Sequence, residues 1–332
     1  MPYATTRELV AALQSGKTSA AALLADSIER IKQFDPALNA VAVRDFERAR
    51  VAALAADAAL ARGDRRPLLG VPVTVKEAFN VEGLPTTWGI PGTGEPPAAE
   101  DAVLVRRLKA AGAIVIGKTN VAMRLADWQS SNPVYGRTNN PWDLARTPGG
   151  SSGGGAAALA AGYVSLEFGS DLVGSLRVPA HFCGVFAHKP THGLVPMRGS
   201  APPGTPALSA DPWVDLAVVG PMARSAADLA LALDAIAGPD DAQAIAYRLA
   251  LPPSRHAALA DFRVLLLDTH PLVPTSAAVR SALQRLADGL ARAGCRVERG
   301  SPLLPDLARV ASLWGQLLWA QLGADMPGAE AG

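Results

Sequence analysis

The chain has 332 residues, of which 49% are hydrophobic and 18% charged, and its 31 basic residues nearly balance 30 acidic ones. This composition is typical of a folded globular protein and excludes a disordered chain or a strongly basic nucleic-acid binder. Two cysteines are too few for a disulfide scaffold and favour a reducing compartment. The amino terminus carries charges where a secretory signal has an apolar core, and the longest uncharged stretch, residues 147–166, is too rich in glycine and serine to span a bilayer. We therefore expect a cytoplasmic protein that binds neither nucleic acid nor a membrane.

The first part of the chain predicts helices. Thr5 and Glu8 have the spacing of a capping box, and leucines and isoleucines recur after them at helical intervals. Asp35-Pro36 is expected to end this helical run. A second, alanine-rich helix is expected over about 44–62.

An alternation of strands and helices follows. Val71, Val73 and Val75 alternate with other residues and predict a strand that ends at Lys76. Residues 196–212 hold five prolines and two glycines and are expected to form a surface loop. The pattern as a whole predicts one α/β domain. Its other expected elements are a helix over 101–111, a strand over 113–116, a strand over 163–168, a helix over 226–237, a strand over 262–267, a helix over 276–293, a strand over 295–297 and a helix over 304–322.

Two short motifs match patterns of other enzyme classes. Residues 112–119 fit the Walker A pattern letter for letter, but the four variable positions are Ala-Ile-Val-Ile. We expect these four to be a strand that cannot curl around a phosphate, with Gly117 and Lys118 in the loop that follows. Gly-Gly-Ser-Ser-Gly-Gly fits the nucleophile-elbow pattern G-x-S-x-G at Ser151 and at Ser152, but the segment before it is a poor strand. A Ser-His-Asp triad is therefore disfavoured, although several histidines are available for one, namely His188, His192, His256 and His270.

Three segments in a fixed order carry a more specific signal. They are Gly70-Val-Pro-Val-Thr-Val-Lys76-Glu-Ala-Phe, Thr147-Pro-Gly-Gly-Ser151-Ser152-Gly-Gly and Gly169-Ser-Asp171-Leu-Val-Gly-Ser175-Leu-Arg177-Val-Pro-Ala. Together they closely resemble the amidase signature family of serine hydrolases. The resemblance implies an α/β fold with a mixed sheet covered by helices on both faces. It also implies a single domain over 1–332, with amino-terminal helices over 1–66, a catalytic core over 67–240 and a carboxy-terminal α/β part over 241–332 that is shorter than in the family.

The resemblance also implies a catalytic Ser–cis-Ser–Lys triad. Ser175 would be the nucleophile, Ser151 the bridging serine preceded by a cis peptide bond, and Lys76 the general base. The backbone amides of Leu172, Val173 and Gly174 would form the oxyanion hole, with that of Ser175. Three further side chains would support the site, namely Ser152, Asp171 and Arg177.

The residues themselves make such a triad physically reasonable. A lysine amine in water has a pKa of about 10.4 and is a poor base at neutral pH, but burial can lower that pKa by several units. Lys76 ends an apolar strand and would be buried in a sheet covered on both faces. The glycines around Ser151 allow an unusual backbone path. The alternative interpretations are an exposed lysine at a strand end, a flexible glycine-serine linker and an ordinary ion pair between Asp171 and Arg177.

The chain departs from the family pattern in two places. The family usually has glycine where this chain has Val173, and a β-branched residue resists positive φ. The turn is therefore either distorted, with loss of activity, or keeps a negative φ at Val173 and only narrows the pocket. Family chains are also considerably longer, so this chain is expected to be a natural short form, a truncated product or a chain whose gap a partner covers.

The reaction expected from these residues is hydrolysis of a carboxamide to a carboxylic acid and ammonia or an amine. We expect a small-molecule amide as the binding partner and no cofactor. Whether the chain forms a homodimer is left open. The spacing of His181, Cys183 and His188 fits no usual zinc pattern, so we expect no metal. The alternatives are the amidase subunit of a tRNA-dependent amidotransferase, a catalytically impaired binding protein of the same fold and, more distantly, a P-loop nucleotide-binding protein.

Overall fold

The computed structural model describes residues 1–205 and 215–324, and it divides the chain into two compact units, residues 1–249 and 250–332. Each unit is described by itself below. The single domain that the resemblance implies stays a prediction.

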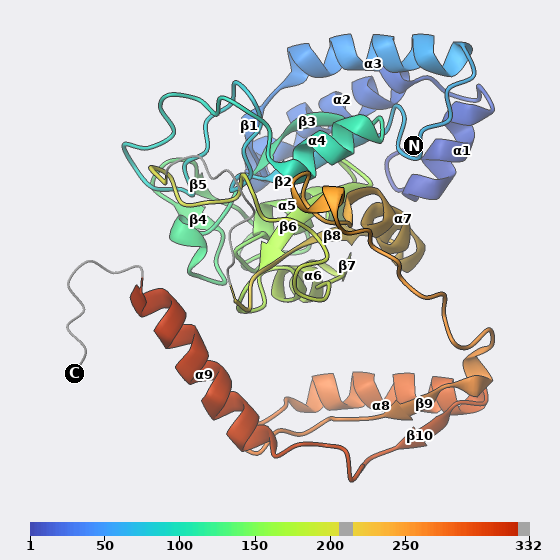
Figure 1. Cartoon of the computed structure of the whole chain (residues 1–332), viewed down its shortest axis with the longest axis vertical. Coiled ribbons are helices and arrows are strands. Elements are labelled where there is room, and N and C mark those ends of the chain that lie inside the picture. Colours follow the sequence, from blue (N-terminus) through green and yellow to red (C-terminus); the bar gives the residue numbers. More distant parts are fainter. Residues whose placement is uncertain (206–214, 325–332) are drawn as a thin grey trace. The chain divides into compact units, whose positions relative to one another are not determined.

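The first unit is built on a mixed sheet of six strands among the described residues, in the order β1-β3-β2-β6-β8-β7 (Figure 1). β2 runs parallel to β3 and to β6, whereas β1 is antiparallel to β3, and β8 is antiparallel to both β6 and β7. Every residue of β2 is buried because the strand lies between two neighbours and is covered on its faces. The strands are β1 (Val41–Arg44), β2 (Pro72–Lys76), β3 (Ile114–Thr119), β6 (Leu166–Asp171), β7 (Phe186–Ala187) and β8 (Val218–Ala223), with the separate short pair β4 (Ser131–Asn132) and β5 (Gly136–Arg137).

Helices pack against this sheet, and one of them lies close to most of its strands. α5 begins directly after the serine-containing turn and contacts β1, β2, β3, β6 and β8. Its sequence, Gly-Gly-Gly-Ala-Ala-Ala-Leu-Ala, has small side chains that allow such close approach. The helices of this unit are α1 (Thr6–Gln14), α2 (Ala20–Leu38), α3 (Phe46–Ala61), α4 (Val103–Ala110), α5 (Gly153–Ala160), α6 (Arg177–Cys183) and α7 (Ala226–Ile236), with the 3-10 turns η1 (Met123–Leu125) and η2 (Gln243–Ile245).

The mixed sheet with its helices confirms the expected fold class, and the capping box of Thr5 and Glu8 is present. The expected helix end at Asp35-Pro36 is wrong, because α2 continues through Pro36 to Leu38. Proline in the last turn removes only one helical hydrogen bond, and Asn39 in the left-handed conformation then ends the helix. The Asp35 carboxylate accepts the N–H of Ala40 at 2.8 Å and leads the chain into β1.

Two other expectations about strands need correction. Gly117 and Lys118 lie inside β3 and not in the loop after it, because β3 pairs with β1 and β2 as far as Thr119. The strand expected over 163–168 begins at Leu166 and ends at Asp171. Strands β1 and β8 and the short strands β4, β5 and β7 were not predicted. Of the proline-rich segment 196–212, residues 196–205 form no helix or strand, and residues 206–212 lie outside the described part.

The second unit contains a parallel pair of strands joined by a helix. β9 (Arg263–Leu265) pairs with β10 (Arg296–Glu298), and α8 (Ala277–Arg292) connects them, which confirms the expected strand–helix–strand order. The 3-10 turn η3 (Leu259–Asp261) precedes β9, and α9 (Leu307–Ala324) follows β10. None of the helices in the described residues is long and apolar enough to cross a bilayer.

Candidate active site

Lys76 ends the central strand β2 and is fully buried. Its amine nitrogen lies 2.7 Å from Ser151 Oγ and 3.0 Å from Ser170 Oγ. Burial lowers the pKa of Lys76 to about 7, although the nearby Asp171 and Glu167 carboxyl groups act to raise it. A substantial fraction of this lysine is therefore uncharged near neutral pH and able to accept a proton.

Ser151 lies in the turn between residue 147 and α5, and the Gly150–Ser151 peptide bond is cis. Its side chain is fully buried beside the lysine amine. Ser152 is also buried, and its hydroxyl donates to the Ser170 carbonyl at 3.4 Å. The Ser152 N–H donates to the Ser175 carbonyl at 3.3 Å, which ties this turn to the loop that carries Ser175.

Ser175 lies between strand β6 and helix α6 and is 7% exposed. Asp171, at the end of β6, holds this turn: its carboxylate accepts the N–H groups of Gly174 at 2.8 Å and Leu176 at 3.1 Å. Arg177 binds both oxygens of the same carboxylate, each at 2.9 Å. Although burial alone would raise the pKa of Asp171, these hydrogen bonds and the Arg177 charge hold it below its usual value. The carboxylate is therefore a charged anchor for the turn.

Val173 does not adopt a left-handed backbone conformation, whereas Gly174, with φ of +99°, does. The position that requires glycine is therefore Gly174, and the valine fits the turn without that requirement. The N–H groups of Leu172, Val173 and Ser175 make no hydrogen bond to another described residue, whereas the N–H of Gly174 is donated to Asp171. The Ser175 hydroxyl likewise has no hydrogen bond within the described residues.

Two residues of the site were missed by the sequence analysis. Ser170 contacts the Lys76 amine, and Glu167 is a fully buried carboxyl on β6 that accepts the hydroxyls of Thr74 and Thr119. Burial raises the pKa of Glu167 to about 8, against these hydrogen bonds and the charge of Lys76. The sequence signal for Glu167 was a charged residue inside an apolar strand. The place of Ser170 depends on the parallel pairing of β2 with β6, which brings Lys76 and Ser170 to the same edge of the sheet.

A model of the family described as Amidase matches residues 22–326 of this chain. The chain belongs to the amidase family. A putative amidase, AmiB2, from Mycobacterium tuberculosis is 44% identical over 234 residues, which cover 69% of this chain and 48% of the relative. Indoleacetamide hydrolase from Bradyrhizobium diazoefficiens is 38% identical over 315 residues, which cover 94% of this chain and 58% of that protein.

Solved structures agree with this assignment. The peptide amidase PAM has a TM-score of 0.81 and 30% identity, and the match covers 98% of this amidase-family chain and 67% of the peptide amidase. This chain therefore spans about half the length of the relatives named above and two thirds of a solved structure of the same family.

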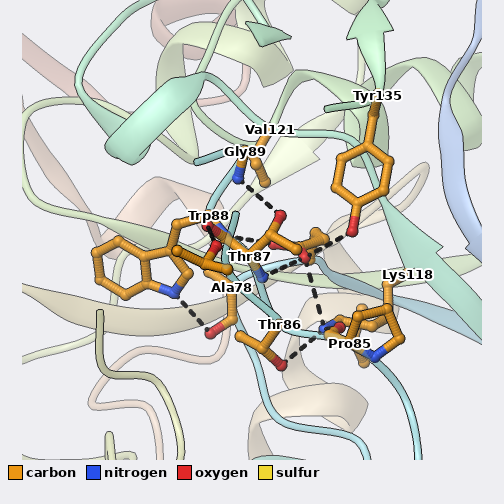
Figure 2. Close-up of polar contacts among 12 residues, drawn as sticks. Ala78, Pro85, Thr86, Thr87, Trp88, Gly89, Lys118, Val121 and Tyr135 are labelled. Carbon is orange, nitrogen blue, oxygen red and sulfur yellow. Dashed lines mark hydrogen bonds and ion pairs between the residues drawn. The ribbon is translucent and has the colours of Figure 1, made fainter. Parts of the chain in front are cut away.

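The lysine of the Walker A match serves as an anchor for the loop after β2 in this amidase-family fold (Figure 2). Lys118 is fully buried, with its amine 3.9 Å from the Glu77 carboxylate, and it donates to the Pro85 carbonyl and to Thr86 Oγ1. Burial lowers the pKa of Lys118 to about 8, and the negative charge of Glu77 opposes that shift. The Glu77 carboxylate also accepts the Tyr135 hydroxyl at 3.1 Å and the N–H groups of residues 87 and 88.

The cysteine and histidines that raised the question of a metal do not form a cluster. Cys183 is buried, and its thiol donates to the Pro148 carbonyl at 3.5 Å. Burial raises the pKa of this thiol to about 12, so it remains protonated. No group of three histidine, cysteine or acidic side chains able to hold a metal is found in residues 1–205 and 215–324.

Proposed function

We propose that this chain hydrolyses carboxamides, with Ser175 as nucleophile, Ser151 as proton relay and Lys76 as general base. One observation carries the proposal: a fully buried lysine amine lies 2.7 Å from the hydroxyl of Ser151. Membership of the amidase family supports amide hydrolysis as the reaction class.

The electrostatics of the site support the role of Lys76 as a base. An exposed lysine would be almost entirely protonated at neutral pH, whereas the pKa of about 7 leaves Lys76 close to half uncharged there. A base whose pKa lies near the working pH combines availability with proton affinity.

The reaction then proceeds by acyl transfer in two stages. Ser151 passes its proton to Lys76 and takes the proton of Ser175, whose oxygen attacks the amide carbonyl carbon. The tetrahedral intermediate collapses with cleavage of the C–N bond, and the leaving nitrogen receives the proton from Lys76 through Ser151. Water, deprotonated along the same path, then cleaves the ester to release the carboxylic acid and restore Ser175.

The turn before Ser175 would stabilise the negative oxygen of the tetrahedral intermediate. The N–H groups of Leu172, Val173 and Ser175 are the ones without a hydrogen-bond partner among the described residues. Since the N–H of Gly174 is donated to Asp171, we assign the oxyanion contacts to the other three amides. Gly174 would act by letting the chain turn, and its own place in the oxyanion hole stays a prediction.

We infer a small organic amide as the substrate. The relative named indoleacetamide hydrolase matches 94% of this chain, so indole-3-acetamide is a reasonable first member of a test panel. Both cysteines are free thiols, which supports the cytoplasm as the location. A homodimer stays an open proposal.

The decisive experiment is labelling with a fluorophosphonate, followed by peptide mapping and assay on a panel of amides. We expect modification at Ser175 in the wild type, and loss of both labelling and amide hydrolysis in Ser175→Ala and Lys76→Ala. Absence of labelling and of turnover in a folded sample would contradict the proposal and favour the non-catalytic binding role.

A further inference from the structure

The segment of residues 127–130, between η1 and β4, contacts both serine-bearing turns. The indole N–H of Trp128 donates to the Val173 carbonyl at 3.0 Å, two residues before Ser175. On its other side, the Trp128 carbonyl accepts the hydroxyl of Thr147 at 3.2 Å, at the start of the turn that leads to Ser151.

The contact with the Ser151 turn is close. A side-chain carbon added at Gly150 would lie 2.4 Å from the Asp127 carbonyl oxygen and 2.9 Å from the carbonyl carbon of Trp128. Ser130 adds hydrogen bonds to the same turn, since its hydroxyl accepts the Gly153 N–H at 2.9 Å and donates to the Gly149 carbonyl at 3.1 Å. The backbone of Trp128 is therefore fixed against the Ser151 turn, and its side chain reaches from there to the Ser175 turn.

The peptide unit between Val173 and Gly174 is consequently held at both ends. Its carbonyl accepts from Trp128, and its N–H donates to Asp171. Rotation of this peptide plane would change the direction of the neighbouring amides of Val173 and Ser175, the groups that face the substrate in the proposed mechanism. Because residue Trp128 is 53% exposed, burial does not dictate this hydrogen bond.

We propose that Trp128 is a positioning residue for catalysis: its indole N–H fixes the Val173–Gly174 peptide so that the oxyanion-binding amides around Ser175 are aligned before substrate arrives. This inference rests on the proposed amide hydrolysis at Ser175. A neutral hydrogen bond of this kind raises the catalytic rate about tenfold when its stabilising effect acts mainly on the transition state.

The test uses two changes that remove the donor while keeping an aromatic ring. They are Trp128→Phe and the isosteric replacement of Trp128 by 3-benzothienylalanine, which has sulfur in place of the N–H group. Trp142→Phe is the matched control, because Trp142 is 74% exposed and its indole N–H donates to the Cys183 carbonyl at 2.8 Å, away from Ser175.

We expect kcat to fall about tenfold in both Trp128 variants, with KM changed less than about twofold. The affinity for trifluoromethyl ketones, which form a tetrahedral adduct with the nucleophile, should fall by the same factor as kcat/KM, while the affinity for the product acid is unchanged. Thermal stability should stay near that of the wild type. Trp142→Phe should match the wild type in every measurement.

The inference is overturned if both Trp128 variants retain the wild-type kcat and trifluoromethyl ketone affinity. It is also overturned if product-acid affinity and ketone affinity fall together, since that would indicate general disruption of the site. Either result leaves the proposed function intact when Ser175 is still labelled in the wild type. If the wild type neither labels at Ser175 nor hydrolyses amides, the proposed function fails, and this inference fails with it.

Discussion

Ser170 Oγ lies 3.0 Å from Lys76 Nζ, so the amine has a second hydroxyl partner besides Ser151. Lysine has a long, flexible side chain, and two partners restrict the position of its nitrogen more than one. Ser170 is thus suited to keep the amine within reach of Ser151 throughout the proposed reaction.

Loss of this contact should slow catalysis without abolishing it. For Ser170→Ala we expect kcat/KM to fall about 10- to 100-fold, because a hydrogen bond to a group that becomes charged is worth about 1.5–3 kcal/mol. Ser170→Thr keeps the hydroxyl and should remain within a few-fold of the wild type. Steady-state kinetics and the rate of fluorophosphonate labelling measure both variants. Wild-type rates in Ser170→Ala would show that Ser151 alone positions the amine.

The pH dependence of kcat/KM should have an acid limb near pH 7. Since Lys76 must be uncharged to accept a proton and its pKa is about 7, the rate should fall about tenfold per pH unit well below that value. The labelling rate of Ser175 should follow the same limb, because it depends on the same base. An acid limb below pH 5 in both assays would instead point to a carboxylate as the titrating base.

The buried Lys76 and Glu167 should affect folding stability in opposite pH ranges. The folded-state pKa of Lys76 lies below its ordinary value. Burial of the charged amine therefore destabilises the folded state fully below about pH 7, and this destabilisation disappears as the pH rises toward 10.5. The folded-state pKa of Glu167 lies above its ordinary value of 4.5, so stability is lost as the pH rises from there toward about 8.

Thermal unfolding of two variants at pH 6 and pH 9 tests this pair of shifts. Lys76→Met should raise the melting temperature relative to the wild type, and more at pH 6 than at pH 9. Glu167→Gln should show the reverse, with its larger gain at pH 9. If neither difference changes between the two pH values, the two groups do not titrate in the folded protein with the shifted pKa values.

The Ser175 turn should tolerate a change at Val173 and not at Gly174. Gly174 has φ of +99°, and an added side-chain carbon would lie 2.9 Å from Val178 Cγ2, so Gly174→Ala should cost about 1–3 kcal/mol of folding free energy and most of the activity. Val173→Gly should keep activity within a few-fold while lowering stability by about 0.5–1 kcal/mol through added backbone freedom. Denaturant unfolding and amide turnover check both. The opposite order of effects would place the glycine requirement at position 173.

The sequence was informative about the site wherever local chemistry is unusual. The lysine at the end of a valine-rich strand lies beside the serines between glycines, since the Lys76 amine is hydrogen-bonded to the Ser151 hydroxyl. The carboxylate of Asp171 also lies where the motif suggested, holding the turn and Arg177. The hydrogen bonds around Ser175 could not be predicted from the sequence. The direction of each amide depends on the φ values of the turn, and these values cannot be read from the local sequence pattern.

The errors about helices and strands have different origins. Pro36 was expected to end its helix, but a proline in the last turn costs little when Asn39 and the Asp35 carboxylate complete the helix end. Lys118 was placed in a loop because the strand was expected to end at residue 116, yet β3 continues to Thr119, and the Glu77 carboxylate and the Pro85 carbonyl give the buried amine its partners. Strand β1 was missed because it is short and lies at the edge of the sheet.

The buried contact between Glu77 and Lys118 also restricts how this chain can vary over evolutionary time. Replacing either partner alone leaves an unpaired charge inside the protein, which is far more damaging than replacing both with apolar residues. Substitutions at positions 77 and 118 should therefore arise as a pair, and a collection of selected functional variants should show the two positions covarying.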